Sequence, residues 1–442
     1  MSTIVTVPGV YIEEDASPAI SVSQGATAVP LFIARFTPLD SKYARVITRV
    51  SSWLDFCQKF NSASMLSGRV VITSTPVNEE NTTSYTYSIA SSAVSLSAAT
   101  ALQLYFQNGG GVCYVCALDD SSDNNLLASL PGLADEKGDI TLFAVPENDS
   151  TYQDAIYSAL MASLDVDKGY FMLVDSQDGN VSTGMSNSSH IGIYYPPLTL
   201  SSSLTLEDEN VLISGYTTVG RKRSTVSIPT LKDLRDVDDT MADKVQIALD
   251  SLMADALNVS PSALMAGVYC RVDRERGVWK APANVVLNGV SDVSVRVTDD
   301  AQGTMNEAGV NVIRHFSDRG VVVWGARTQQ DDDNWRYIPV RRLFDAAERD
   351  IKKTMRTMVF EPNNHLTWKR VQAAIENYLY GIWQQGGLTG NKAAEAYFVQ
   401  IGKDLTMTTD DINQGKMIVQ VGMAAVRPAE FIILQFTQNM AQ

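Results

Sequence analysis

Three almost wholly apolar segments are the strongest constraint on the fold of this chain. They are residues 112–118, 140–145 and 170–174. A strand that is apolar along its whole length is typical of a parallel sheet that helices cover on both faces. The middle of the chain is therefore predicted to be an α/β domain.

A helix is predicted between the second and third of these strands. Ser150 and Gln153 have the spacing of a capping box. Apolar residues follow at helical spacing, at Ile156, Leu160 and Leu164. Strand, helix and strand then form a βαβ unit with parallel strands. We also predict strands at 28–36 and 190–196, and helices at 51–60 (capped by Ser51 or Ser52) and 240–257.

Residues 62–100 depart from this pattern. The segment is rich in Ser, Thr and Asn and contains alternating, strand-like pieces such as residues 85–89. Alternation of apolar and polar residues is typical of a strand with one face in solvent. The segment is predicted to be an inserted surface hairpin, and a loose loop is the alternative.

The C-terminal third is more helical. Phe344, Ala347, Ile351, Met355 and Met358 are spaced by three and four residues and define one helix face. A second helix is predicted from residue 367 to the Gly386-Gly387 stop, because glycine favours helix ends. Strands are predicted at 396–401, 416–426 and 430–436.

Cations lie off the apolar face of the first of these helices. They are Arg342, Arg349, Lys352, Lys353 and Arg356. The chain as a whole carries a formal net charge of −15, so a cationic face is unusual within it. Arg349, Lys352, Lys353 and Arg356 are candidates for an electrostatic contact with a neighbouring subunit or another component. The alternative is an ordinary solvated helix face.

Composition bounds the class of protein. A chain of 442 residues is long enough for two or three domains. The acidic balance argues against general nucleic-acid binding, which needs clustered Lys and Arg. No apolar run reaches 18 residues, so membrane insertion is not expected. No secretory signal is seen at the N-terminus, and four scattered cysteines do not form a disulfide framework, so synthesis in a bacterial cytoplasm is expected.

No motif indicates a catalytic, cofactor or metal site. Cys113 and Cys116 have metal-like spacing, but no second Cys/His pair accompanies them and an alternating strand places them on opposite faces. The three histidines, His190, His315 and His365, come without a nucleophile elbow. Asp175, which follows the strand at 170–174, is the one candidate for an enzyme on the middle domain, such as a hydrolase or a nucleotide-binding protein.

Both ends of the chain are predicted to be β-strands, although chain ends are usually frayed and polar. Such arms need a partner, and the edge of another subunit's sheet can supply it. The residues that we expect to take part in strand exchange between subunits are Val5, Val7, Val10, Ile12, Phe431, Ile433, Leu434 and Phe436.

Several segments, in order along the chain, resemble contractile tail sheath proteins of phages and related injection particles. The opening Pro8-Gly9-Val10-Tyr11-Ile12-Glu13-Glu14 is similar to theirs, and residues 266–284 carry the most specific likeness. Further matching stretches are residues 320–328, 335–343, Phe360-Glu361-Pro362-Asn363 and Arg427-Pro428-Ala429-Glu430-Phe431. Residues 62–100 and 176–260 carry no such signature.

The resemblance implies a subunit that forms stacked six-membered rings around an inner tube. In that family the terminal arms add strands to neighbouring subunits, and contraction drives the tube through a target envelope. Implied partners are other copies of the chain, the inner tube protein, baseplate and terminal cap proteins, and paralogous sheath subunits. Neither nucleic acid nor direct membrane insertion is implied. The compact size and the insert favour an extracellular particle similar to the antifeeding prophage, with a phage tail or a bacteriocin as the alternative.

The expected fold class is mixed α/β and α+β. An assembly domain comes from both chain ends and the C-terminal third, and the middle α/β domain faces outward. The expected division is an N-terminal β-arm at 1–22, a first part of the outer region with the insert at 23–100, an α/β outer domain at 101–275, an assembly domain at 276–426 and a C-terminal β-arm at 427–442. A non-contractile coat protein is a further alternative to the sheath function.

Overall fold

The computed structural model describes residues 21–62, 66–77, 85–119, 123–164, 168–181, 185, 187–201, 204–219 and 225–433. The predicted strand-exchange residues Val5, Val7, Val10, Ile12, Leu434 and Phe436 lie outside them. The chain forms two compact units, one of residues Gly25–Arg349 with the segment after Ala424, the other centred on Asp350–Ala424. The mixed α/β class that the sequence predicts is confirmed.

A nine-stranded sheet forms the centre of the larger unit, in the order β14-β17-β16-β8-β7-β6-β1-β5-β2. Its parallel strands are β1 (Pro30–Ala34), β5 (Cys113–Ala117), β6 (Leu142–Ala144), β7 (Phe171–Asp175), β8 (Ile191–Tyr195) and β16 (Val310–Phe316). Antiparallel strands at its two edges are β2 (Thr48–Val50), β14 (Val285–Val286) and β17 (Gly320–Val323). The parallel core predicted from the apolar segments is confirmed.

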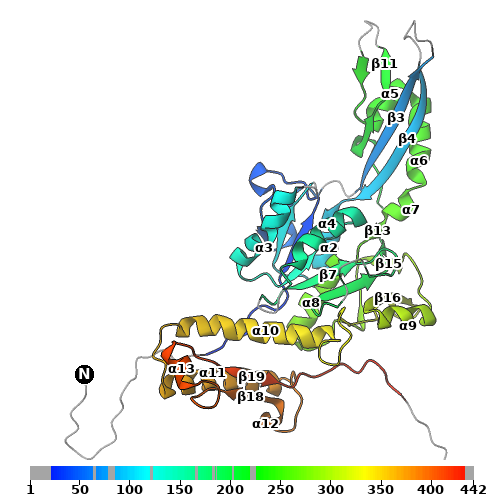
Figure 1. Cartoon of the computed structure of the whole chain (residues 1–442). Helices are drawn as coiled ribbons and strands as arrows, with labels where there is room; N and C mark the ends of the chain where they lie inside the picture. The colour runs from blue at the N-terminus through cyan, green and yellow to red at the C-terminus, as the bar shows by residue number, and fades with distance from the viewer. Residues whose placement is uncertain are drawn as a thin grey trace, which may run out of the picture. The chain divides into compact units, whose positions relative to one another are not determined.

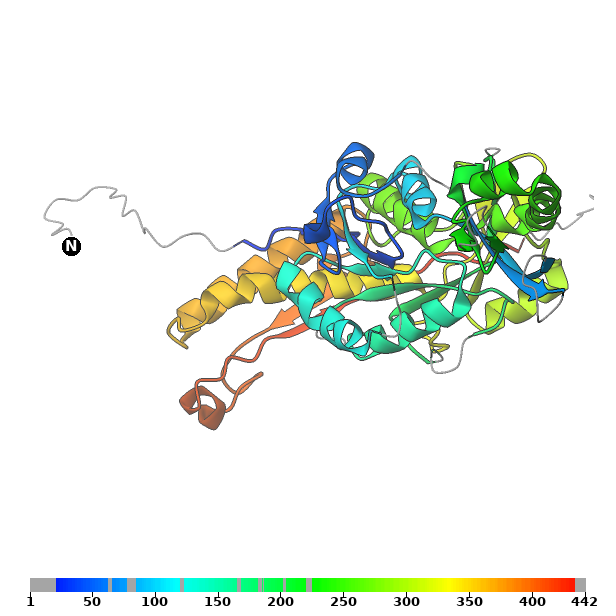
Figure 2. The same ribbon diagram turned by 90° about the horizontal axis from the view of Figure 1, so that it is seen from above.

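Helices cover both faces of this sheet (Figure 2). One face packs against α1 (Trp53–Lys59), α2 (Ala98–Gln107) and α8 (Ser262–Arg276). The other packs against α3 (Asn124–Lys137) and α4 (Ser150–Met161). Cys113 belongs to the first layer and Cys116 to the second, so the two thiols lie on opposite faces, as the alternation of a strand requires.

The helix starts follow local chemistry. Ser52 caps α1, as predicted, because its side chain accepts a hydrogen bond from the Asp55 backbone. The predicted capping box at Ser150 and Gln153 is wrong. Asp149 caps α4 instead, and the Gln153 amide turns inward and donates to the Val145 carbonyl at 3.0 Å.

The insert forms a hairpin of β3 (Leu66–Pro76) and β4 (Tyr85–Leu96), as predicted. It is not an isolated hairpin, because β10 (Val211–Ser214) pairs in parallel with β3. The elements α5 (Leu231–Val237) and α6 (Asp239–Asp250) pack on these strands (Figure 1). Residues from all five elements form a hydrophobic core separate from those of the central sheet. The helix predicted at 240–257 is broken, since α7 (Met253–Ala256) follows α6 as a separate turn.

Shorter elements complete the larger unit. Its remaining strands are β9 (Leu198–Leu200), β11 (Thr217–Val219), β12 (Thr225–Ser227), β13 (Asn258–Val259) and β15 (Val290–Val293). Its further helices are η1 (Ser41–Tyr43), η2 (Asp208–Asn210) and α9 (Asp299–Glu307).

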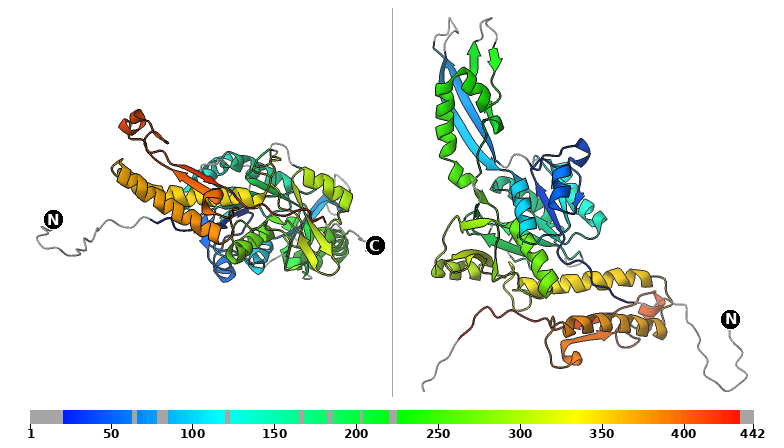
Figure 3. Two further views of the ribbon diagram at one scale, coloured as in Figure 1. Left: turned by 90° about the horizontal axis from the view of Figure 1, so that it is seen from below. Right: turned by 180° about the vertical axis from the view of Figure 1, so that it is seen from behind.

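The smaller unit is helical with one small sheet. Helix α10 (Ile338–Met355) crosses the boundary between the units at Arg349 and Asp350, and η3 (Arg356–Met358) extends it. The remaining elements are α11 (His365–Gln384), α12 (Ala393–Ala396), β18 (Tyr397–Gln400), α13 (Thr409–Asn413) and β19 (Gln420–Met423). Figure 3 shows α11 beside the antiparallel pair β18 and β19, which are both shorter than the strands predicted at 396–401 and 416–426.

The two compact units divide the chain differently from the expected domains. Residues 276–349 were expected to belong to the assembly domain, but they supply β14, β16 and β17 to the central sheet of the larger unit. The functional division of the chain stays a prediction. None of the helices in the described part of the chain is both long enough and apolar enough to cross a membrane.

Asp175 organises the start of α8. Proline at position 261 gives this helix no side-chain cap, and its first turn therefore needs an acceptor from elsewhere. The Asp175 carboxylate accepts from the Ser262 backbone at 2.7 Å and from its hydroxyl at 2.6 Å, and also from Gln153 at 3.1 Å. Burial outweighs these bonds and raises the pKa of Asp175 to about 7.

Replacing Asp175 by Asn is expected to flatten the pH dependence of stability. The folded chain holds the Asp175 proton more tightly than the unfolded chain, whose pKa is about 3.9. This contribution to stability is complete below about pH 4 and is lost as the pH rises to about 7. Three pKa units correspond to about 4 kcal/mol. Urea unfolding of the wild type and of Asp175→Asn between pH 4 and 8 measures the difference.

The exposed Asp178→Asn change serves as the control. The pKa of Asp178 lies below its usual value because Asn180 donates to it, so its removal leaves the slope between pH 4 and 7 unchanged. Parallel pH profiles for wild type and Asp175→Asn would contradict the assignment.

Candidate functional site

The C-terminal arm is attached to the larger unit through one carboxylate, that of Glu430. The guanidinium of Arg327 forms an ion pair with it at 2.7 Å and donates a second hydrogen bond from Nε at 3.0 Å. Asn306 on α9 donates at 2.8 Å and the Tyr337 hydroxyl at 3.2 Å. Four donors from three separate segments therefore hold the base of the arm.

Arg327 is itself held firmly. Asn311 on β16 accepts from the Arg327 backbone N–H at 2.7 Å and donates to its carbonyl at 2.8 Å. A second guanidinium nitrogen of Arg327 donates to the Asn306 carbonyl at 3.1 Å. The arginine is thus fixed before the arm arrives, which limits the entropy lost when it binds the carboxylate.

The charge of Glu430 is stabilised at this site. Burial alone favours the neutral acid, but Arg327, Asn306 and Tyr337 all donate to the carboxylate, and the pKa of Glu430 lies below its usual value. The two side chains are 14% and 20% exposed, so water screens the pair less than it screens a surface ion pair. We call this arrangement the Glu430 clamp.

Apolar side chains follow the clamp directly. Phe431, Ile432 and Ile433 are 72%, 79% and 82% exposed, and they lie in neither helix nor strand in the single chain. Three consecutive exposed apolar residues are rare on a monomer and mark a contact surface. Of the predicted strand-exchange residues, Phe431 and Ile433 are thus described and exposed.

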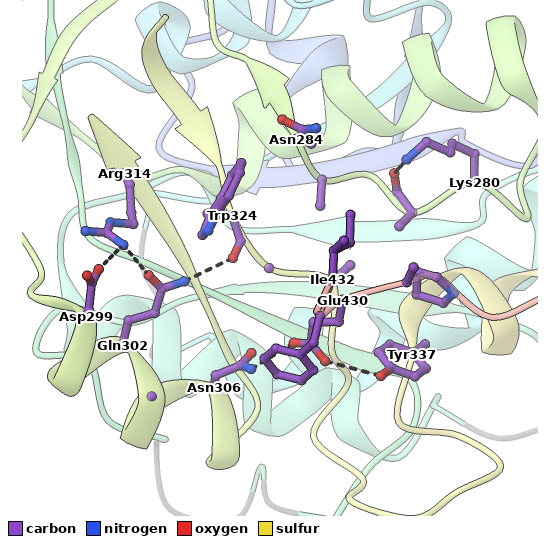
Figure 4. Close-up of a pocket in the computed structure, with 18 residues that line it drawn as sticks. Lys280, Asn284, Asp299, Gln302, Asn306, Arg314, Trp324, Tyr337, Glu430 and Ile432 are labelled. Atoms are coloured by element: carbon purple, nitrogen blue, oxygen red, sulfur yellow. Dashed lines mark hydrogen bonds and ion pairs between the residues drawn. The ribbon is translucent and has the colours of Figure 1, made fainter. Parts of the chain in front are cut away.

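A cavity of about 570 Å³ lies between the arm and the body of the unit. Figure 4 shows Trp324, Lys280 and Asn284 around it, with Ile432 and Glu430 of the arm near the middle of the view. Arg314 is paired with Asp299 at 2.6 Å and with Gln302 at 2.9 Å. The polar side chains at the rim are thereby satisfied within the chain.

A second clamp holds the segment that precedes β1. Arg342 on α10 pairs with Asp273 on α8 through two bonds of 3.0 and 2.6 Å, and both side chains are almost fully buried. The hydroxyl of Thr27 donates to Asp273 at 2.5 Å, and its carbonyl accepts from Arg342 at 3.1 Å. The chain therefore begins its path through the larger unit, at Thr27, next to a buried ion pair.

The predicted cationic helix face is only partly correct. Arg342 is buried in the second clamp, and Arg349 is half-buried and donates to the carbonyls of Gly169 and Ala26. Lys352, Lys353 and Arg356 are exposed at the end of α10 and on η3. Only these last three form an exposed cationic surface.

One set of side chains imitates a hydrolase triad. His190 lies 3.3 Å from the Ser189 hydroxyl and 3.3 Å from the Asp345 carboxylate. All three side chains are buried, and Asp345 is also paired with Arg341 at 2.8 Å. A buried serine of this kind offers no access to a substrate, so the geometry favours a structural role for the three residues.

At the place where the sheet topology favours a ligand, the polar groups are bonded within the chain. Strand order reverses between β1 and β6, and ligands of open α/β sheets bind beyond the carboxyl ends of such strands. Here Arg35 follows β1 and pairs with Asp149 at 2.7 Å, while its backbone N–H donates to the Glu147 carboxylate. Asp175 is committed to α8 in the same way. No group of three or more potential metal ligands occurs among the described residues.

Comparison with known proteins assigns the family. The model of the phage tail sheath protein central domain matches residues 220–329, and that of the phage tail sheath C-terminal domain matches residues 330–439. A subunit of the anti-feeding prophage helical sheath, solved in the contracted state, is 53% identical. The match covers 99% of this chain and 100% of that one, with a TM-score of 0.74. The chain belongs to the contractile tail sheath family.

Other sheath proteins are more distant. The chain is 36% identical to a subunit of the sheath of an extracellular contractile injection system, PVC, over 99% of both chains, with a TM-score of 0.66. A putative prophage major tail sheath protein of Pseudomonas aeruginosa is 25% identical over 187 residues. The chain matches only 25 to 46% of the length of its curated relatives, among them the tail sheath proteins of Vibrio phage KVP40 and Enterobacteria phage T4.

The two clamps explain the sheath-like stretches of the sequence, whose contacts sequence reasoning missed. Asp273 lies in residues 266–284, Arg327 in 320–328, Arg342 in 335–343, and Glu430 in the closing segment. A signal was present for Arg327 and Glu430, because each adjoins an apolar run and buried charges are normally paired, but Asp273 and Arg342 lie among other charged residues. The partners are far apart in the chain and were therefore not identifiable.

Replacing Glu430 by Gln is expected to loosen the arm without unfolding the body. The loss of a charge-assisted bond at a partly exposed site costs about 1–2 kcal/mol, or roughly tenfold in local opening. The expected result is a roughly tenfold faster chymotryptic cleavage after Phe431, which directly follows the clamp, at an unchanged midpoint of global unfolding.

Glu307→Gln on the same helix as Asn306 is the matched control, since Glu307 is exposed and contributes no bond to the clamp. Equal cleavage rates for the two variants and the wild type would show that Glu430 does not hold the arm.

Proposed function

We propose that this chain is the subunit of a contractile sheath that polymerises as stacked six-membered rings around an inner tube. Contraction of the sheath drives the tube through a target envelope. The observation that carries the proposal is the full-length likeness, at 53% identity, to a subunit of a helical sheath in the contracted state. A 54% identical subunit belongs to the six-fold symmetrised baseplate of the anti-feeding prophage, which supports six-membered rings and a baseplate as partner.

The arms join the copies. The apolar residues 431–433 follow the Glu430 clamp and are exposed. Together with Leu434 and Phe436 they add a strand to another copy. The N-terminal residues Val5, Val7, Val10 and Ile12 do the same. Strand addition supplies main-chain hydrogen bonds, and pockets for alternate side chains give specificity.

The acceptor is the sheet of β18 and β19. Among the described residues this sheet has only two strands, and a two-stranded sheet is marginally stable by itself. Its outer edges offer unpaired N–H and C=O groups to incoming strands. A sheet completed by two arms of other copies would hold the polymer together while the bodies move.

The remaining partners follow from the same architecture. The inner tube, the terminal cap and paralogous sheath subunits are proposed partners, and the exposed Lys352, Lys353 and Arg356 form a contact surface for the tube or a neighbouring ring. The particle is made in a bacterial cytoplasm, as a phage tail or as a released tail-like particle. Energy for contraction is stored in the extended state, and the contracted state buries more surface between subunits.

Deleting residues 1–15 is expected to give a folded monomer that does not polymerise, because one donor strand of each junction is lost. Negative-stain microscopy of the purified protein measures tube formation, and circular dichroism confirms the fold. Tubes of normal length from the truncated protein would refute the arm model.

The double change Lys352→Glu and Lys353→Glu is expected to weaken assembly in low salt and to have less effect near 1 M salt, where charges more than about 3 Å apart are screened. Turbidity of the purified chain, with and without tube protein, measures this dependence. The control is Lys403→Glu with Lys137→Glu, at exposed positions outside α10 and η3. If assembly of both variants depends on salt in the same way, the end of α10 is an ordinary solvated surface and not a contact surface.

A further inference from the structure

Helix α6 carries an unusual outer surface. Its inner face, with Met241, Ala242, Val245 and Leu249, is buried against the hairpin strands. On the outside, Asp239, Asp243, Ile247 and Asp250 follow at spacings of four, four and three residues, which places them in one row. We call this row the acidic stripe.

The acidic stripe combines exposed carboxylates with one exposed apolar side chain, that of Ile247. Ile247 is 70% exposed and has Asp243 and Asp250 as its neighbours in the row, with the exposed Lys244 beside it, and the Asp239 and Asp243 side chains are 74% and 66% exposed. Arg235 reaches Asp243 at 3.3 Å and is the one cation in the described chain that pairs with the row. An exposed apolar side chain between two carboxylates is complementary to a surface that combines apolar contact with positive charge.

The same chain carries such a partner surface. A groove of about 580 Å³ lies between the C-terminal half of α8 and the segment that contains β14. Its floor contains Ala281, Ala283, Val285 and Val286, and Val286 is 39% exposed. We call it the cationic groove, because Arg271, Arg276 and Lys280 also line it.

The cations of the groove have no carboxylate partner within the described chain. Arg271 donates to the Val286 carbonyl at 3.0 Å and Lys280 to the Ala281 carbonyl at 3.2 Å, and no described acidic side chain forms an ion pair with either of them or with Arg276. Glu275 is the single acid among the lining residues. In a chain of net charge −15, this concentration of unpaired positive charge is the exception.

We propose that the acidic stripe of one copy docks in the cationic groove of a second copy. Ile247 contacts the apolar floor, and Asp243 and Asp250 pair with Arg276 and Lys280. A helix that presents an apolar anchor to a groove is a recurrent mode of recognition. The contact rests on the self-assembly proposed above.

The chemistry of the two surfaces fixes the type of interface. The stripe and the groove are different parts of one chain, so a contact between them is heterologous. Such contacts build rings or open helical polymers instead of closed pairs. The carboxylates of Asp243 and Asp250 are seven residues apart, about 10 Å along a helix, which suits two separate cations on the rim of the groove.

Charge reversal tests the contact. The variants are Asp243→Lys with Asp250→Lys, Arg276→Glu with Lys280→Glu, and the combination of all four. Each double variant is expected to raise the concentration needed for polymerisation at low salt at least about tenfold, because like charges then face each other. The fourfold variant is expected to recover most of the loss, since it restores opposite charges. Light scattering and electron microscopy measure polymer, and circular dichroism confirms the fold of each variant.

The matched control is Glu136→Lys with Asp410→Lys, which changes the net charge as the first variant does, at exposed positions elsewhere. Double variants that polymerise like this control overturn the proposal, and so does a fourfold variant that recovers nothing. A wild-type chain that forms no polymer would contradict the proposed assembly instead.

A cysteine pair tests the contact independently of charge. Ile247→Cys and Val286→Cys chains, mixed and oxidised, are expected to give a mixed disulfide dimer that neither chain gives alone, because disulfides require Cα atoms within about 7 Å. Formation of this dimer supports the contact in any oligomer, and its absence at concentrations where the chain self-associates overturns it.

Discussion

The buried pair of Asp273 and Arg342 is the interaction on which the larger unit depends most. It joins α8 to α10, and through Thr27 it fixes the point where the chain enters β1. The guanidinium also lies 4.4 Å from the centre of the Tyr269 ring, whose hydroxyl bonds Tyr194 on β8. Removing one member of such a pair leaves an uncompensated charge in the core, at a cost of about 3–5 kcal/mol. The sheath-specific sequence is therefore first of all a folding constraint.

Much of the central sheet was predictable from the sequence. Segments that are apolar along their length became β1, β5, β6, β7 and β8, because burial on both faces leaves no position for a polar side chain. The insert at 62–100 became a hairpin for the opposite reason, since its alternating residues face a core on one side only. These features depend on local pattern, and local pattern is what a sequence displays directly.

Features that depend on distant partners were not predictable in the same way. Gln153 does not form the predicted capping box, because its amide donates hydrogen bonds to the buried Val145 carbonyl and the Asp175 carboxylate. Arg342 and Arg349 do not belong to an exposed cationic face, because they donate hydrogen bonds to acceptors on α8 and on the segment before β1. The arm predicted at residues 427–442 includes Glu430, but the Glu430 clamp joins residues 103 positions apart. Spacing along one helix or strand carries no information about such pairs.

The position of β1 has a mechanical consequence. This strand follows Thr27 by a few residues and is hydrogen-bonded to a parallel neighbour on each side, β5 and β6. A strand at the edge of a sheet can be peeled away one bond at a time, whereas an interior strand pulled along its length must break two ladders together. Tension on the chain before Thr27 would thus act in shear on an interior strand, and the body would resist it as a single block.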